Sequence, residues 1–372
     1  MFEIRRALIG VTVFATLFLM VAISAQAATH QKSILFVNPG HQGMGFWKSV
    51  TDTMRAAANH FGYELVVVSG DRKWPLMTAR GLEAIKQTNA DYIILVNENQ
   101  QAPALMKAAE DRRIPYLLLL NGLTAEQEKT LGGPRETLKY WLGTITPNNE
   151  IAGYEMATSL KEAANNLGLN NGNVSLLTLA GDFKTPASMS RLAGLDRALG
   201  ESPSLVEMRR MTVNWSEQEA YDRTSIYLRA TPVDAIWAAN DNIAKGAIRA
   251  IRETGKSPGK DVVVAGLNWS TACVRAVMDG TMTLTHGGHF LAGAWSIVML
   301  HDYDQGQDFA SISKHISFPM SAITQDNAAE YLRYFQQEDW SKINFSYFSR
   351  ANNPKRQNYP FDLKTLLSTV ER

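Results

Sequence analysis

Residues 38–47 read Asn-Pro-Gly-His-Gln-Gly-Met-Gly-Phe-Trp and decide the fold, because they join an apolar run to a helix-like segment. The apolar run is Ser33-Ile34-Leu35-Phe36-Val37, and the helix-like segment begins near Phe46. This order predicts the first strand-to-helix turn of an α/β sheet. Ligands bind beyond the carboxyl ends of the strands in such sheets. A turn with three glycines and two adjacent aromatic residues therefore predicts one half of a ligand cleft.

The same pattern of apolar run, turn and amphipathic segment repeats along the chain. In the first half, strand-like runs fall at 33–37, 64–68, 92–96 and 116–120, and helix-like segments at 46–61, 76–89 and 102–112. In the second half, helix-like segments fall at 148–167, 187–199, 216–229, 242–254 and 270–279, and strand-like runs at 173–180, 206–213, 234–239, 262–267 and 281–285. Apolar runs without alternation are typical of parallel strands covered on both faces by helices. The chain is therefore predicted to be α/β, with two Rossmann-like lobes built on parallel sheets and joined by crossing hinge strands.

A length of 372 residues suits two lobes better than one core. We expect a signal peptide at 1–27, an N-terminal lobe at 32–145 that is completed by about 288–315, a C-terminal lobe at 146–287, and a final crossing with a tail at 316–372. Residues 122–140 interrupt the pattern as a linker or flap. The tail is rich in aromatic residues, which predicts that it packs rather than remains disordered.

The N-terminus has the three regions of a secretory signal. Arg5 and Arg6 precede the apolar run 7–23, and Ala25-Gln26-Ala27 supplies small residues for cleavage. We therefore expect export to the periplasm and cleavage after Ala27, with a retained membrane anchor as the alternative.

The mature chain carries no net charge. Removing two arginines and one glutamate from the 37 basic and 36 acidic residues leaves 35 of each. No basic stripe is present, so neither nucleic acid nor an anionic membrane is an expected partner. Cys273 is the single cysteine, which excludes an internal disulfide and a cysteine-based zinc site, and we expect it to be buried in a helix.

Asparagine ends five of the apolar runs. These residues are Asn38, Asn97, Asn121, Asn240 and Asn268. A single asparagine at such a position is more often a helix cap or turn residue than a ligand contact. Because the strand ends of one sheet converge on one edge, five together predict a cleft lined with uncharged donors and acceptors. Such a lining suits a neutral polyhydroxylated or amide-bearing molecule and does not suit a phosphate.

Tryptophans follow several of the same strands. Trp47, Trp215 and Trp269 could either stack on a ligand ring or belong to the core, whereas a core position is favoured for Trp74. Trp141, Trp237 and Trp295 lie within regular patterns and are predicted to be core residues. Arg191 lies in the first turns of a helix, where it could offer a planar fork to vicinal oxygens or lie on the surface.

Motifs for catalysis or cofactor binding are weak. Gly40, Gly43 and Gly45 are spaced Gly-x-x-Gly-x-Gly, which is not the dinucleotide fingerprint. His41, His286 and His289 could meet at a metal, but the His-x-x-His pair at 286 and 289 lacks a carboxylate or a third ligand at a recognised spacing. The nucleophile elbow and the phosphate-binding loop are absent from the sequence. We therefore expect no enzyme activity, no cofactor and no metal, with a secreted α/β enzyme as a remote alternative.

Over residues 32–320 the chain resembles the type I periplasmic solute-binding proteins, the ribose- and galactose-binding group of ABC importers. The resemblance rests on residues 46–47, 91–97, 113–115, 143–149 with Gly153, 191–194, 213–215, 239–241 with 246–247, 264–266 and 278–280. It implies that the protein captures a small, neutral, sugar-like or polyol ligand between its lobes and delivers it to a membrane permease.

The resemblance also implies site residues. Phe46 and Trp47 would stack on the ligand, Arg191 would hold hydroxyl groups, and Trp215 would close over the ring. The polar contacts would come from Asn121, Asn240 and Asn268, and we add Gln42, Asn97 and Trp269 as further ligand-binding candidates. The family usually has Asp-Arg at positions 121–122 and Asp at 268, so a simple pentose or hexose is in doubt here.

Residues 39–42 with 46–47 resemble the first loop of the periplasmic autoinducer receptors. This second likeness implies an alternative function, in which the protein senses its ligand and signals through a membrane sensor kinase or diguanylate cyclase.

Overall fold

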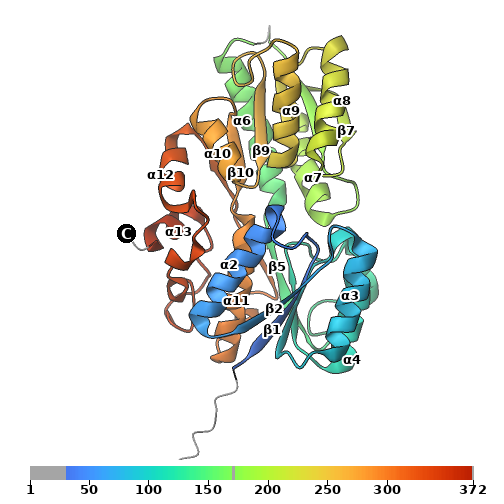
Figure 1. Ribbon diagram of the computed structural model, residues 1–372, viewed down its shortest axis with the longest axis vertical. Helices are drawn as coiled ribbons and strands as arrows, with labels where there is room; N and C mark the ends of the chain where they lie inside the picture. The colour runs from blue at the N-terminus through green and yellow to red at the C-terminus, as the bar shows by residue number, and fades with distance from the viewer. Residues whose placement is uncertain (1–30, 170–171, 371–372) are drawn as a thin grey trace, which may run out of the picture. The chain divides into compact units, whose positions relative to one another are not determined.

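Two six-stranded sheets organise the described part of the chain, residues 31–169 and 172–370 of the computed structural model (Figure 1). Each sheet has helices on both faces and forms one lobe. The fold predicted from the apolar pattern, two α/β lobes with parallel sheets, is confirmed. The expected signal peptide at 1–27 lies outside the described residues.

The N-terminal lobe has the strand order β11-β5-β4-β3-β1-β2, and all its neighbouring strands are parallel. The strands are β1 (Ser33–Asn38), β2 (Glu64–Ser69), β3 (Tyr92–Leu95), β4 (Tyr116–Leu119), β5 (Trp141–Pro147) and β11 (His315–Phe318). The helices are α2 (Gly45–Phe61), α3 (Trp74–Gln87), α4 (Ala102–Arg112), α5 (Ala125–Leu131) and α11 (Ala292–Asp304). Every residue of β3 and β4 is buried, as expected for central strands covered on both faces.

The C-terminal lobe has the strand order β12-β10-β9-β8-β6-β7. The strands are β6 (Val174–Ala180), β7 (Leu205–Thr212), β8 (Ala235–Ala238), β9 (Val263–Leu267), β10 (Leu284–Gly287) and β12 (Ser321–Ile323). The helices are α6 (Asn149–Asn166), α7 (Pro186–Glu201), α8 (Glu217–Ala230), α9 (Asp241–Glu253) and α10 (Thr271–Met278). The edge strand β12 runs antiparallel to β10, which is a small departure from the all-parallel prediction.

Three segments cross between the lobes. β5 leads into α6, β10 leads through a 3₁₀ turn at His289–Leu291 into α11, and β11 leads into β12. The sequence pattern does not predict β5 or α11. Glycine, threonine and proline dilute the apolar character of β5, and α11 is buried on nearly every side, so it lacks a helical period.

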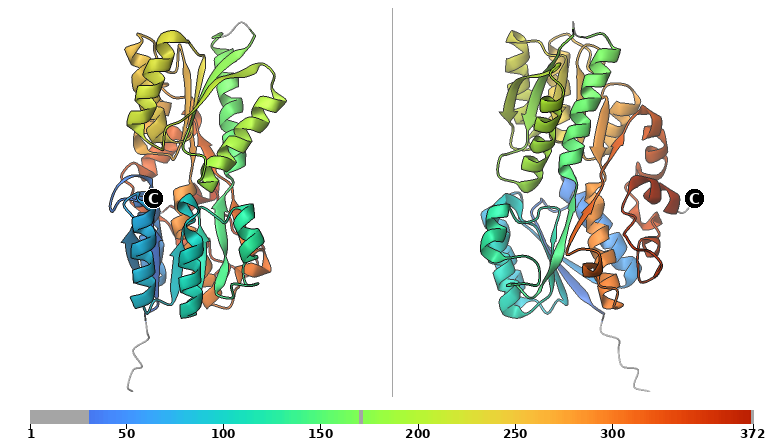
Figure 2. Two further views of the ribbon diagram at one scale, coloured as in Figure 1. Left: turned by 90° about the vertical axis from the view of Figure 1, so that its right-hand side faces the viewer. Right: turned by 180° about the vertical axis from the view of Figure 1, so that it is seen from behind.

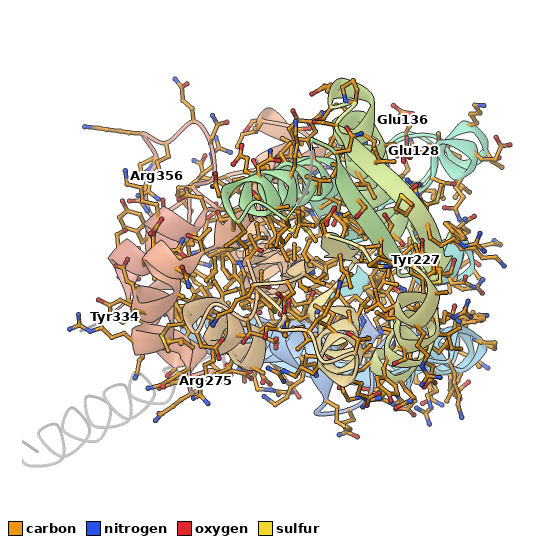
Figure 3. The ribbon with its side chains drawn as sticks, turned by 90° about the horizontal axis from the view of Figure 1, so that it is seen from above. Glu128, Glu136, Tyr227, Arg275, Tyr334 and Arg356 are labelled. Atoms are coloured by element: carbon orange, nitrogen blue, oxygen red, sulfur yellow. The ribbon has the colours of Figure 1, made fainter. Side chains whose placement is uncertain are left out.

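The residues after β12 form a C-terminal segment that packs on both lobes. It contains α12 (Gln325–Phe335), 3₁₀ turns at Trp340–Lys342 and Phe345–Tyr347, and α13 (Leu363–Thr369). α12 lies against α10 of the C-terminal lobe, and the later part lies against α2 and α11 of the N-terminal lobe (Figures 1 and 2). The prediction that the aromatic tail packs is therefore confirmed. In the view from above, its residues Tyr334 and Arg356 lie at the periphery (Figure 3).

Buried tryptophans anchor both cores. Trp141, Trp237 and Trp295 are almost completely buried, as predicted, and Cys273 is buried in α10. Trp74 differs from the prediction, because 48% of it is exposed at the start of α3. Within residues 31–169 and 172–370, none of the helices combines the length and the apolar character that crossing a membrane requires.

Candidate ligand site between the lobes

A cavity of about 340 Å³ lies where the carboxyl ends of the two sheets face each other. We call it the inner cavity. Residues from both lobes line it: His41, Met44, Gly45, Phe46, Trp47, Arg72, Glu98, Leu120, Asn121, Pro147, Thr185, Ala187, Arg191, Trp215, Asn240, Asn242, Asn268 and His289. Its size falls within the range of small-molecule sites.

The opening turn supplies an aromatic wall. Phe46 and Trp47 begin α2 and pack edge to face, with ring centroids 5.3 Å apart. The His289 ring stacks on Phe46 at 4.4 Å and extends the wall. A Cβ at Gly40 would lie 2.2 Å from the Cβ of Trp47, so only glycine lets the turn approach the indole this closely.

Trp215 lines the cavity from the C-terminal lobe. Its Nε1 donates to Asp182 Oδ2 at 2.6 Å, and its ring covers Gly181, where a Cβ would lie 2.3 Å from Trp215 Cζ2. Burial raises the pKa of Asp182, but hydrogen bonds from Thr185, Lys184 and Trp215 outweigh burial and leave it below its ordinary value. Asp182 therefore stays ionised and fixes the indole orientation.

Arg191 lies against the cavity with only 3% of its surface exposed. Its Nε donates to Asn149 Oδ1 at 2.9 Å and its Nη1 donates to the Ala239 carbonyl at 2.8 Å, while Nη2 lies 3.4 Å from His289 Nε2. Burial lowers the pKa of Arg191 to about 10, so the guanidinium remains cationic at neutral pH. Because a guanidinium has five N–H donors, two remain for a ligand after these three contacts.

His289 is neutral in this setting. Burial and the nearby Arg191 and His286 lower its pKa well below the ordinary value. A neutral imidazole can accept a hydrogen bond at one ring nitrogen and donate at the other. His289 can therefore accept from the Arg191 guanidinium without repelling it.

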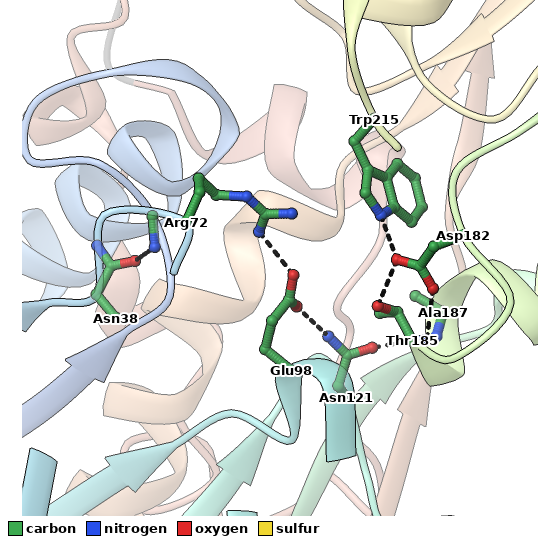
Figure 4. A network of polar contacts seen from close by, with 9 residues as sticks. Asn38, Arg72, Glu98, Asn121, Asp182, Thr185, Ala187 and Trp215 are labelled. Carbon is green, nitrogen blue, oxygen red and sulfur yellow. Dashed lines mark hydrogen bonds and ion pairs between the residues drawn. The ribbon is translucent and has the colours of Figure 1, made fainter. Parts of the chain in front are cut away.

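A polar network joins the loops after β2, β3 and β4 of the N-terminal lobe to α7 of the C-terminal lobe (Figure 4). Arg72 Nη1 donates to Glu98 Oε1 at 2.6 Å, and Asn121 Nδ2 donates to Glu98 Oε2 at 3.3 Å. Burial raises the pKa of Glu98, and the ion pair with Arg72 opposes that shift. The Ala187 backbone N–H of α7 donates to Asn121 Oδ1 at 3.1 Å, which links the lobes directly.

A second contact also crosses between the lobes. Gln100 Nε2 donates to the Lys184 carbonyl at 3.3 Å. Both contacts require that the strand ends of the two sheets lie close together. The lobes are therefore closed over the inner cavity.

Most of the predicted site residues line the inner cavity. These are Phe46, Trp47, Asn121, Arg191, Trp215, Asn240 and Asn268. Asn240 also caps α9, because its Oδ1 accepts from the Ile243 N–H at 2.9 Å. Gln42, Asn97 and Trp269 do not line this cavity.

Each of the three remaining residues has another place in the fold. Gln42 is exposed on the opening turn. Asn97 is buried, donates to the Gly122 carbonyl and accepts from the Ala102 N–H, so it holds the loop that starts α4. Trp269 is buried on the far side of Asn268, where its Nε1 donates to the Ser321 carbonyl at 2.9 Å.

Several lining residues were not expected from the sequence. Arg72 and Glu98 come from loops after β2 and β3, and Asn242 follows the capping Asn240. For His289 the sequence suggests only a role as a metal ligand. The shared signal is position, since each follows a strand end by a few residues, but the sequence alone does not distinguish such polar residues from solvated ones.

Metal binding finds no support in this geometry. Within the described residues, His, Cys, Asp and Glu form no group of three or more that could hold a metal ion. His286 Nε2 instead pairs with Glu155 Oε2 at 2.7 Å, and His289 lies against Arg191 and Phe46.

The chain is similar to several known binding proteins. The family model of the periplasmic binding protein domain matches residues 34–308. The chain is 23% identical over 270 residues to the galactofuranose-binding protein YtfQ of Escherichia coli (strain K12), which covers 70% of this chain and 78% of that protein. It is 27% identical over 287 residues to a D-apiose import binding protein of Paraburkholderia graminis, with coverages of 73% and 80%.

A crystal structure of a periplasmic sugar-binding protein from Pseudomonas fluorescens shares the fold with a TM-score of 0.81 and 29% identity. The match covers 90% of this chain and 99% of that chain. Because 90% of the 372 residues exceeds the 323 residues that precede the C-terminal segment, the likeness includes part of that segment.

Proposed function

We propose that this chain, which belongs to the family of periplasmic binding protein domains, captures a small sugar-like or polyol ligand in the inner cavity and delivers it to an ABC importer. The ligand would bind between the lobes and favour the closed form, because it contacts both of them. The asparagine side chains that line the cavity and Arg191 would bind its hydroxyl groups.

One observation carries the proposal: aromatic side chains and polar groups from two lobes line one cavity. Phe46 and Trp47 line it from the N-terminal lobe and Trp215 lines it from the C-terminal lobe, which suits the apolar faces of a sugar ring. Asn121, Asn240 and Asn268 add uncharged donors and acceptors, which suit hydroxyl groups at the ring edge.

The names of the relatives support the sugar class and the import route. The similar proteins are named for galactofuranose and D-apiose binding, and one of them for import. We propose a permease as the membrane partner and the periplasm as the location, which agrees with the signal-like residues 1–27.

Thermal melting with a ligand panel tests the proposal. The panel contains aldoses, ketoses, cyclic polyols and the matching sugar acids. A neutral sugar or polyol should raise the melting midpoint in proportion to the logarithm of its concentration. The cationic Arg191 by itself would favour an acidic ligand. The neutral-ligand proposal therefore fails if sugar acids raise the midpoint and their neutral parent sugars do not.

A further inference from the structure

A second cavity of about 450 Å³ adjoins the inner one, and we call it the outer cavity. Four residues line both cavities: Arg72, Glu98, Thr185 and Trp215. The two spaces therefore meet along these residues, which are the Arg72–Glu98 ion pair of one lobe and Thr185 and Trp215 of the other.

Two exposed aromatic side chains line the outer cavity. Trp74 at the start of α3 is 48% exposed, and Phe183 in the loop after β6 is 58% exposed. Large apolar side chains that remain exposed together, beside polar groups, mark binding surfaces rather than ordinary surface. Because they come from opposite lobes, closure brings both to the same cavity.

The backbone around the outer cavity is held in an unusual conformation. Arg72, Asn99, Asn214 and Trp215 all line it, and all have left-handed φ values of 57°, 47°, 47° and 59°. Such values are disfavoured for residues other than glycine and gather at sites where function fixes a side chain. The conformation orients polar and aromatic groups from three different loops into this space.

We propose that the outer cavity is a second subsite, which binds a second glycosyl unit attached to the sugar in the inner cavity. A second ring would use Trp74 and Phe183 as apolar stacking faces, and Asn99 and Asn214 as polar contacts. This inference rests on the proposed function, since it extends the same ligand. It makes the preferred ligand a disaccharide or a glycoside rather than a free monosaccharide.

Calorimetric titration with matched sugars tests the second subsite. The full mature protein is titrated with galactose, lactose and melibiose, and with glucose, maltose and cellobiose. We expect a disaccharide to bind about tenfold or more tightly than its parent monosaccharide. Trp74→Ala and Phe183→Ala should each lower the disaccharide affinity about tenfold and change the monosaccharide affinity less than about twofold.

Ile226→Ala is the control, because Ile226 is 69% exposed on α8 and lines neither cavity. The subsite proposal is overturned if monosaccharides bind as tightly as disaccharides, or if both aromatic variants keep the disaccharide gain. If none of these six sugars binds but another neutral sugar or polyol raises the melting midpoint, the subsite proposal alone is overturned. If no sugar or polyol binds at all, the proposed function itself fails.

Discussion

The inner cavity has two flanks. The C-terminal flank lies beside the C-terminal segment, and the open flank lies beside the outer cavity. The two flanks differ in whether their aromatic side chains are buried or exposed. On the C-terminal flank, Trp269 packs against Tyr331 at 5.4 Å and Phe290 packs against Trp340 at 5.0 Å, and all four side chains are buried. On the open flank, beside the outer cavity, Trp74 and Phe183 remain largely exposed.

The inter-lobe contacts differ in the same way. The open flank has hydrogen bonds across the lobes, such as the one from Gln100 to Lys184. The C-terminal flank has buried rings, and two of the three crossings contact it through Phe290 and Ser321. Buried apolar contacts resist separation, whereas exposed hydrogen bonds exchange readily with water. We therefore expect the lobes to open at the open flank and to pivot at the C-terminal flank.

The largest expected effect is a loss of folding stability, and it tests whether the two flanks differ. Trp340→Ala removes a buried ring that packs on Phe290 and Phe335, and should lower the free energy of unfolding by about 3–5 kcal/mol. Trp74→Ala, a matched change on the open flank, should lower it by less than about 1 kcal/mol. Urea unfolding followed by circular dichroism measures both, and equal losses would show that the flanks do not differ.

The next effect is on ligand affinity. Arg191→Ala and Trp215→Ala should each weaken binding of the best panel sugar by about 2–4 kcal/mol, because each removes a group that lines the cavity. Arg197→Ala is the matched control on the same helix, since Arg197 is exposed and pairs with Glu150. Titration calorimetry compares the three variants. Unchanged affinity in the first two would remove both residues from the site.

Folding stability should depend on pH through His289, which lies next to Phe46. Phe46 lines the inner cavity and a smaller cavity on the C-terminal flank. The pKa of His289 is lowered in the folded state by burial and by Arg191, so the unfolded chain binds more protons once the pH falls below about 6.5. Folding stability should therefore fall with acidification, by at most about 1.4 kcal/mol per pH unit from this group.

His289→Gln should reduce this slope when unfolding is measured at several pH values between 7 and 5. His315→Gln is the control, because His315 is exposed on β11 and does not line the inner cavity. An unchanged slope in His289→Gln would contradict the assignment.

The smallest expected effect tests whether the lobes separate at the open flank. Gln100→Ala removes one contact to Lys184 and should weaken ligand binding by about 0.5–1 kcal/mol, because the closed form loses a hydrogen bond. Small-angle X-ray scattering of the unliganded variant should show a larger radius of gyration. Gln337→Ala, on the exposed surface of the C-terminal segment, should change neither quantity. A larger radius in Gln337→Ala alone would reverse the assignment of the flanks.

The sequence predicts the fold class well because buried parallel strands leave long apolar runs. β3 and β4 are recognisable in this way, since every one of their residues is buried. β5 and α11 escape prediction for opposite reasons. β5 carries too few apolar residues for a clear run, and α11 is too uniformly buried to show a helical period.

The cavity lining is predictable only in part, because position after a strand does not determine side-chain direction. Asn97 and Asn121 both follow central strands, yet Asn97 turns into the protein to hold a loop and Asn121 lines the cavity. Glu98 could not be assigned to the site from sequence, because its place depends on an ion pair with Arg72 from a different loop. Tertiary contacts of this kind are not encoded in local spacing.

A crystal structure of the protein with the sugar selected by melting tests the central claim most directly. We expect one sugar ring in the inner cavity, between Trp47 and Trp215, with an oxygen within hydrogen-bond distance of the Arg191 guanidinium. A ligand bound elsewhere on the protein, with no sugar oxygen near Arg191, would contradict it.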